Sequence, residues 1–278
     1  YIDVVPPGDI RNCICALART DAVLLDLFQY RFDTEDDFLS GHAIGNLLIA
    51  GLKEMRGSIS EALALLSGWM QVQGQILPAA AEPLVLHAEF ADGTRATGES
   101  KIARQGKRIA RVTLTTMDGA PARTASPQVV EAIMAADLVV LGPGSLYTSI
   151  LPNLLVSEIG EAVCRTRADT GRRILMPPQW MSYRGPGMPG RMVHTGGFDP
   201  FSSWHVVALK PWTTPAENTP DTDETLGDRP RVAVIGGGTG LPVILRGLKR
   251  LDVAITAIVT VADDGGSSGI IRDYIDVV

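Results

Sequence analysis

The sequence predicts an α/β fold: a Rossmann-like three-layer domain with a mainly parallel sheet, whose elements follow one another in circularly permuted order. Two observations near the C-terminus predict the sheet: a β-branched run that ends in a glycine turn, and a second buried run about twenty residues later. A third observation predicts the permutation, because the last five residues repeat the first five.

The repeat lies at the two ends of the chain. Residues 274–278 read Tyr-Ile-Asp-Val-Val, as do residues 1–5. Overlaying them gives one continuous sequence, GIIRDYIDVVPPGDIRN, which runs from the C-terminal segment into the N-terminal one. We therefore expect a circle that was opened once, in a loop close to a ligand site, so that Val278 connects to Pro6 in the unpermuted order.

Composition places the chain among globular proteins. Its 278 residues can bury a substantial core, and an apolar fraction of 45% and a charged fraction of 20% are ordinary values. A net charge of −6 without any Lys/Arg-rich run argues against a nucleic-acid partner. There is no signal-peptide pattern and no apolar run near the ~20 residues that span a bilayer. We therefore expect a soluble cytoplasmic protein with no membrane partner.

The three cysteines support the same compartment. Cys13, Cys15 and Cys164 lack the spacing of a disulfide framework, which suits a reducing cytoplasm. No second Cys/His pair stands at partner spacing from Cys13 and Cys15, so we expect buried small apolar residues there, in preference to half a metal site.

The strand predicted at residues 231–235 ends in a glycine turn, and residues 241–250 follow with apolar side chains at helical spacing. Glycines let the backbone bend sharply and admit a phosphate close to the amide groups, and the helix N-terminus adds a positive dipole end. A tight turn without a ligand is the alternative. The predicted phosphate-binding residues are Gly236, Gly237, Gly238, Thr239 and Gly240.

The second strand is predicted at residues 254–262, a run typical of an interior parallel strand. A carboxylate at its end is where Rossmann-like folds bind ribose hydroxyls, and two adjacent carboxylates can instead hold a divalent cation such as Mg²⁺. The alternative is a polar loop that caps the next helix. The residues concerned are Asp263, Asp264, Gly265, Gly266, Ser267 and Ser268, with Asp263 and Asp264 as the candidate metal ligands.

Joining the ends brings residues 6–12 directly after this loop. Asp9 is predicted as the N-cap of a helix that runs through Ala18. Arg11 and Asn12 in its first turn would face an anionic ligand, with the Arg11 guanidinium as a bidentate phosphate donor. A surface pair between Asp9 and Arg11 is the alternative.

The middle of the chain predicts two helices, at residues 43–55 and 60–70. Asn46 lies on the apolar first helix and must find a partner or reach a site. His42, just before that helix, is more typical of a capping or core histidine than of a catalytic base.

A β-hairpin is predicted from residues 84–90 through a turn at Asp92-Gly93 and a polar strand to Ile102, with a further strand at residues 109–114. This antiparallel excursion would cover the ligand or form a contact between identical subunits.

A second glycine turn follows a helix predicted to 136 and a buried strand at residues 138–141. Such a turn after a parallel strand forms the opposite wall of a ligand crevice. Ser145 is not expected to be a nucleophile, because the turn lacks the G-x-S-x-G pattern and no triad is evident. Hydroxyls and backbone of the wall are expected at Gly142, Gly144, Ser145, Tyr147 and Thr148.

These motifs resemble the YvcK family of gluconeogenesis factors, which is related to CofD, the 2-phospho-lactate transferase. The resemblance implies one CofD-like domain made of residues 6–165 and 230–278, with residues 166–229 as an irregular connector. The motifs that carry it are at residues 236–241, 260–269, 6–12, 27–32, 40–49, 142–149 and 152–156.

The resemblance also implies a function. The family's role points to a UDP-sugar-binding regulator, linked to gluconeogenic carbon metabolism and to the control of cell envelope and cell shape, with no residue set that compels a reaction. One alternative is a CofD-like transferase that acts with a nucleotide-diphosphate donor and Mg²⁺. The other is a permuted chain that binds nothing.

Overall fold

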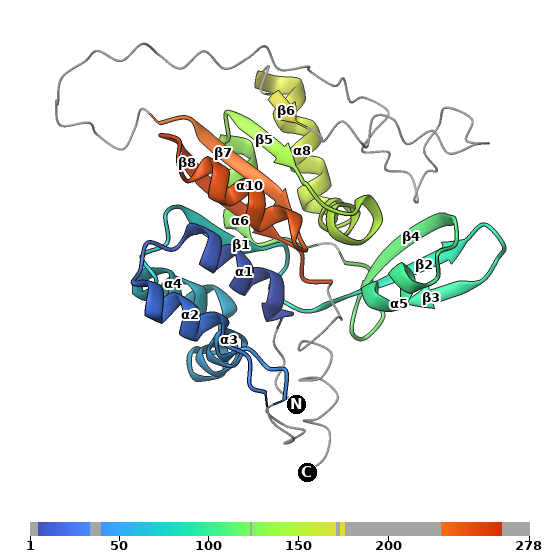
Figure 1. Ribbon diagram of the computed structural model, residues 1–278. Helices are drawn as coiled ribbons and strands as arrows, with labels where there is room; N and C mark the ends of the chain where they lie inside the picture. The colour runs from blue at the N-terminus through green and yellow to red at the C-terminus, as the bar shows by residue number, and fades with distance from the viewer. Residues whose placement is uncertain (1–4, 34–39, 123, 171–172, 176–228, 263–278) are drawn as a thin grey trace.

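The computed structural model describes residues 5–33, 40–122, 124–170, 173–175 and 229–262 (Figure 1). The predicted loop at 263–268, the terminal repeat beyond Val5 and most of the predicted connector lie outside these ranges. The side chains of residues 167–175 are likewise not described.

A parallel five-stranded sheet forms the centre of the described part of the chain. Its strand order is β1 (Gln75–Pro78), β8 (Ala254–Val259), β7 (Arg231–Gly236), β5 (Leu138–Leu141) and β6 (Arg173–Leu175). The two strands that come last in the chain are therefore interior strands. Both are rich in β-branched residues, and their inner residues are buried except for the partly buried Thr256, as interior parallel strands require. The predicted α/β fold class is confirmed.

The direction of the connections reverses between β7 and β5. From β7 the chain crosses to β8 on one side, whereas from β5 it crosses to β6 on the other. Such a reversal is a topological switch point, and open α/β sheets bind ligands outside the carboxyl ends of the strands at this place. The fold thus brings the two predicted glycine turns, which follow β7 and β5, to neighbouring positions.

Helices cover both faces of the sheet (Figure 1). The helices α1 (Pro7–Leu17) and α10 (Gly240–Leu248) pack against each other and on β8, with α10 in front of the sheet in Figure 1. Behind it lies α6 (Pro127–Ala135), packed against α8 (Ser157–Thr170). These layers confirm the three-layer arrangement, and α8 extends past residue 165, into the start of the predicted connector.

Three further helices adjoin α1 and β1. They are α2 (Ala22–Gln29), α3 (Ile44–Arg56) and α4 (Ile59–Trp69), of which α3 and α4 confirm the predicted helices within a residue. The hydroxyl of Ser58 caps α4 by accepting the Glu61 N–H at 3.5 Å. A shorter segment of two parts, a π-helical turn η1 (Leu146–Ile150) and α7 (Leu151–Leu154), follows the second glycine turn.

The antiparallel excursion is a separate small sheet, to the right in Figure 1, with strand order β3 (Arg95–Thr97), β2 (Leu84–Phe90) and β4 (Ile109–Thr116). The predicted strand to Ile102 is wrong in its second half, where α5 (Glu99–Arg104) forms. Ile102 is buried whereas its helical neighbours are not, and the acidic first turn and basic last turn suit the helix dipole.

The core is one continuous apolar cluster that joins the helices to both sheets. Cys13 and Cys15 belong to it, and burial raises the pKa of the Cys15 thiol to about 11, so both behave as small apolar residues. Among the helices of the described ranges, none combines the length and the apolar character needed to cross a bilayer.

Candidate functional site

Two glycine turns meet at the switch point. The Gly142 N–H donates to the Ile235 carbonyl at 2.8 Å, so the turn after β5 begins beside the last residues of β7. A methyl group added to Gly240 would lie 2.3 Å from the Pro143 carbonyl oxygen. A methyl group on Gly144 would lie 3.3 Å from the Gly237 carbonyl oxygen. The backbones of the two turns are therefore in close contact, and only glycine allows that approach at Gly240.

The first turn of α1 forms the third side of this site. The prediction that Asp9 is the N-cap is wrong. The helix begins earlier, with Pro6 at the N-cap position and Pro7 as its first residue. Proline is well suited to that place, since its fixed φ fits the helix and the first N–H groups have no helical partner. The Asp9 carboxylate instead accepts the Gly238 N–H at 2.5 Å, across the join between the two halves of the sequence.

This contact fixes the glycine loop. Gly238 has φ +64°, a left-handed conformation that glycine adopts without strain, and it turns the N–H toward Asp9. A methyl group on Gly237 would lie 2.8 Å from the same carboxylate and 2.4 Å from the Thr260 side chain. Asp9 therefore holds the loop in position against α1 and the end of β8.

Arg11 lies deep in the same helical turn. Its side chain is only 6% exposed and Asp9 is buried too, so the alternative of a surface pair between them is wrong. Arg11 Nη2 donates to the side-chain Oδ1 of Asn12 at 2.8 Å, whereas Nε and Nη1 have no hydrogen-bond partner among the described residues. Buried donors of this kind are costly unless something accepts from them. Burial lowers the pKa of Arg11, Arg31 lowers it further, and Cys15 and Asp9 offset part of this.

Arg31 adds a positive charge that acts on Arg11, and His42 lies close to Arg31. Arg31 donates to the Gly41 carbonyl at 2.6 Å, next to His42, which is 3% exposed. Burial lowers the pKa of His42, and the charge of Arg31 lowers it further. His42 Nδ1 has no hydrogen-bond partner in the described part of the chain. Arg31 is thus a second cation close enough to act on Arg11, and an anion placed beside the two would be stabilised by both.

The segment after Gly142, predicted as the opposite wall, lies beside the glycine loop. Ser145 is exposed and its hydroxyl accepts the Thr148 N–H at 3.4 Å at the start of η1. Tyr147 is half-buried, whereas Thr148 is buried. The Ser149 hydroxyl lies 3.3 Å from the position of a methyl group on Gly238, so this wall directly adjoins the glycine loop.

Asn153, on α7, is a residue of the site that the sequence did not single out. It is fully buried, and its amide donates to the Ser149 carbonyl at 2.8 Å and to the Gly236 carbonyl at 3.2 Å. One side chain thereby ties the wall after β5 to the end of β7. Asn46, which was predicted at the site, is fully buried on α3, the helix that packs against α1.

Replacing Asn153 with leucine should lower the free energy of unfolding by about 1–3 kcal/mol, because the Ser149 and Gly236 carbonyls each lose the hydrogen bond from the Asn153 amide while the volume stays similar. The Gly236 carbonyl keeps the Thr260 N–H as a donor. Urea unfolding of the two proteins measures the difference. Gln128→Leu, at an exposed position of α6, is the matched control and should stay within about 0.5 kcal/mol of the parent. Equal stability of the Asn153→Leu protein and the parent would contradict the bridging role.

The predicted Mg²⁺ ligands are not placed. Asp263 and Asp264 lie outside the described residues, as do the glycines and serines at 265–268. Within the described ranges, no group of three His, Cys, Asp or Glu side chains is arranged to hold a metal ion. The metal and ribose roles of these aspartates stay predictions.

Known proteins match most of this chain. The model of the family described as 2-phospho-L-lactate transferase CofD matches residues 1–171 and 232–278. The gluconeogenesis factor of Listeria innocua is 47% identical over 167 residues, which are 60% of this chain and 50% of that protein. The corresponding protein of Halalkalibacterium halodurans is 46% identical over 167 residues, with the same shares. The chain thus spans about half the length of these curated relatives.

Solved structures agree with the sequence relatives. A crystal structure of a member of the UPF0052 family from Bacillus halodurans superposes with a TM-score of 0.52 and 47% identity, covering 56% of this chain and 49% of that one. Another crystal structure of a protein from the same organism gives a TM-score of 0.55 and 44% identity, covering 62% and 52%. The chain therefore belongs to the CofD family, and its relatives within that family are gluconeogenesis factors.

Proposed function

We propose that this chain binds an anionic nucleotide-sugar of the UDP-sugar type in the crevice between the glycine loop after β7 and the wall after β5. One observation carries the proposal: a buried arginine with unpartnered donors lies in the helical turn that Asp9 joins to the glycine loop, at the switch point of a parallel sheet.

The chemistry of each part suits a diphosphate linked to sugars. The N-terminus of α10 and the glycine loop offer backbone N–H groups, and Arg11 offers a guanidinium with two donors to spare. Ser145 and Tyr147 on the facing wall carry hydroxyl groups that can bond sugar hydroxyls. Asp263 or Asp264 would reach the ribose or hold a metal ion, as the sequence predicts.

The role we propose is regulatory. Cys13 and Cys15 lie buried on α1, and burial raises the pKa of both, which leaves them as unreactive thiols. A binding protein of this kind, acting in the cytoplasm, would report a nucleotide-sugar level to gluconeogenic carbon metabolism and to cell-envelope and cell-shape control. The name gluconeogenesis factor carried by its relatives supports the metabolic link.

A transferase is the second candidate, and the name of the matching family favours it. In that case the crevice would hold a nucleotide-diphosphate donor with Mg²⁺, and the donor group would pass to a second substrate.

Thermal unfolding with UDP-glucose, GDP and NAD tests the first proposal, because a ligand that binds only the folded chain raises the melting temperature in proportion to RT ln(1 + [L]/Kd). We expect a shift with UDP-glucose and intact nucleotide afterwards by chromatography. Nucleotide turnover in the presence of Mg²⁺ and a deazaflavin acceptor would favour the transferase. No shift with any of the three ligands would reject both candidates.

A further inference from the structure

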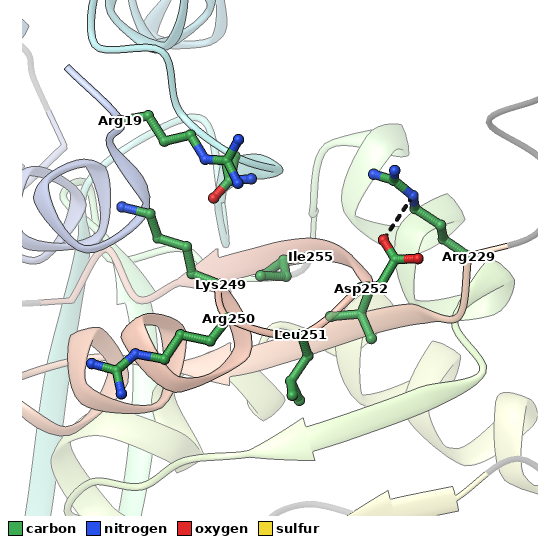
Figure 2. Close-up of a pocket in the computed structure, with 9 residues that line it drawn as sticks. Arg19, Arg229, Lys249, Arg250, Leu251, Asp252 and Ile255 are labelled. Atoms are coloured by element: carbon green, nitrogen blue, oxygen red, sulfur yellow. Dashed lines mark ion pairs between the residues drawn. The ribbon is translucent and has the colours of Figure 1, made fainter. Parts of the chain in front are cut away.

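A second cavity lies at the amino ends of β7 and β8, at the opposite edge of the sheet from the glycine loop (Figure 2). Its volume of about 330 Å³ is at the small end of the roughly 300–1,000 Å³ that is usual for small-molecule sites. Four basic side chains and one acidic side chain line it, although the chain as a whole has a net charge of −6. The charged lining residues are Arg19, Arg229, Lys249, Arg250 and Asp252.

The single carboxylate is already engaged. Asp252 accepts from Arg229 at 2.9 Å, on one side of the cavity in Figure 2. Arg19 and Lys249 lie on the other side, beyond Ile255, and come from the ends of two different helices. Arg19 has no ion pair and no side-chain hydrogen bond with any residue that the structure describes. Arg19 and Lys249 therefore line the cavity while its one lining carboxylate, Asp252, is paired with Arg229.

Capping of helix ends explains only part of this arrangement. Lys249 donates to the Ala18 carbonyl at the end of α1, a favourable place for one positive charge. A second cation beside it is not favourable, and burial together with the charge of Arg19 lowers the pKa of Lys249. The Arg19 backbone is held in position by its N–H, which lies 3.2 Å from the Met70 and Gln71 carbonyls.

Gln73 adds a neutral group to the lining. Its N–H donates to the Leu17 carbonyl at 3.0 Å, so its position is fixed, and its buried Oε1 has no donor among the described residues. An amide oxygen in this setting is satisfied by a hydroxyl group. We propose that the cavity binds a small phosphorylated sugar, with the phosphate between Arg19 and Lys249 and a sugar hydroxyl on Gln73.

This site is separate from the nucleotide-sugar crevice. The first turns of α1 and α10 lie at the proposed crevice, whereas the residues that directly follow the two helices line the cavity. The two sites are therefore at opposite ends of the same pair of packed helices, and each can be changed without altering the residues of the other.

Calorimetric titration of the full chain with glucose 6-phosphate, at constant ionic strength, tests the proposal. We expect the parent protein to bind and Arg19→Gln to bind at least about tenfold more weakly, because a charge-assisted hydrogen bond is lost. Inorganic phosphate should bind more weakly than the ester, since it leaves Gln73 without a sugar hydroxyl. Arg19→Lys keeps the charge and should recover most of the affinity.

Arg246→Gln is the matched control, because Arg246 is exposed on α10, the helix that ends just before Lys249, and does not line the cavity. It should change the affinity less than about twofold. The proposal is overturned if the parent protein does not bind glucose 6-phosphate or if Arg19→Gln binds it as tightly as the parent does. It is also overturned if Arg246→Gln loses as much affinity as Arg19→Gln. Equal affinities for inorganic phosphate and glucose 6-phosphate would contradict the proposed contact between Gln73 and a sugar hydroxyl. Loss in an Arg11 variant with retention in Arg19→Gln would place the probe in the crevice and also overturn it.

Discussion

Replacing Gly240 with alanine should lower the free energy of unfolding by about 1–3 kcal/mol, because the new methyl group would lie 2.3 Å from the Pro143 carbonyl oxygen. The methyl group is attached directly to the backbone and meets a backbone oxygen, so no side chain can give way and the two glycine turns must move apart. Since these turns would form the two walls of the proposed crevice, we also expect the variant to lose most of its affinity for UDP-glucose. Urea unfolding and calorimetric titration measure the two effects.

Gly247→Ala is the control for this variant. It lies on the same helix with nothing within 4 Å of the added methyl group. Alanine in a helix is favoured over glycine by about 0.5–1 kcal/mol, so this variant should be at least as stable as the parent and should bind as the parent does. Similar behaviour of the two variants would show that the turns are not in close contact.

Replacing Arg11 with methionine should have opposite effects on binding and on stability. The affinity for UDP-glucose should fall by about 10- to 100-fold, because a charge-assisted contact with phosphate is lost. The free energy of unfolding should stay the same or rise by about 1 kcal/mol, because a buried cation with two unpartnered donors is replaced by an apolar chain of similar length. Sites that bind ligands commonly reduce stability in this way.

Arg56→Met makes the same change of charge at the exposed end of α3 and should alter neither quantity appreciably. If Arg11→Met were strongly destabilised and bound UDP-glucose normally, Arg11 would be a structural residue and not part of an anion site.

Much of the fold could be predicted because strongly periodic segments determine it. The runs that became β7 and β8, and the leucine-rich segment of α4, have the expected structure with small shifts at their ends. Short elements were not predictable. β1 has four residues and ends in Pro78, and β6 has three, so neither carries a period of its own, and both form because a neighbouring parallel strand supplies their hydrogen bonds.

The position of Asp9 shows how local signals can mislead. An aspartate near a predicted helix start is a common N-cap, and that pattern predicts a helix that begins about one turn too late. The proline pair begins the helix instead, and this lets the Asp9 carboxylate reach the Gly238 N–H, which is distant in sequence.

The parts of the candidate site that consist of glycine turns could be predicted from the sequence. The parts that consist of buried side chains were harder to predict. Glycine turns after strands can be recognised in a sequence, and the structure places both at the switch point. The contributions of Arg31, His42 and Asn153 to the candidate site depend on contacts between segments that are distant in sequence. The signal that singles out Asn46, a polar residue inside an otherwise apolar stretch, is also present at Asn153 and is the one that could have found it.

The central claim is that the crevice beside Arg11 binds a nucleotide-sugar. Calorimetric titration of the full chain with UDP-glucose, run in parallel on the parent, Arg11→Met and Arg56→Met, tests it most directly. We predict saturable binding by the parent and by Arg56→Met, and affinity about 10- to 100-fold lower for Arg11→Met. Absence of binding by the parent, or equal affinity in all three proteins, would contradict it.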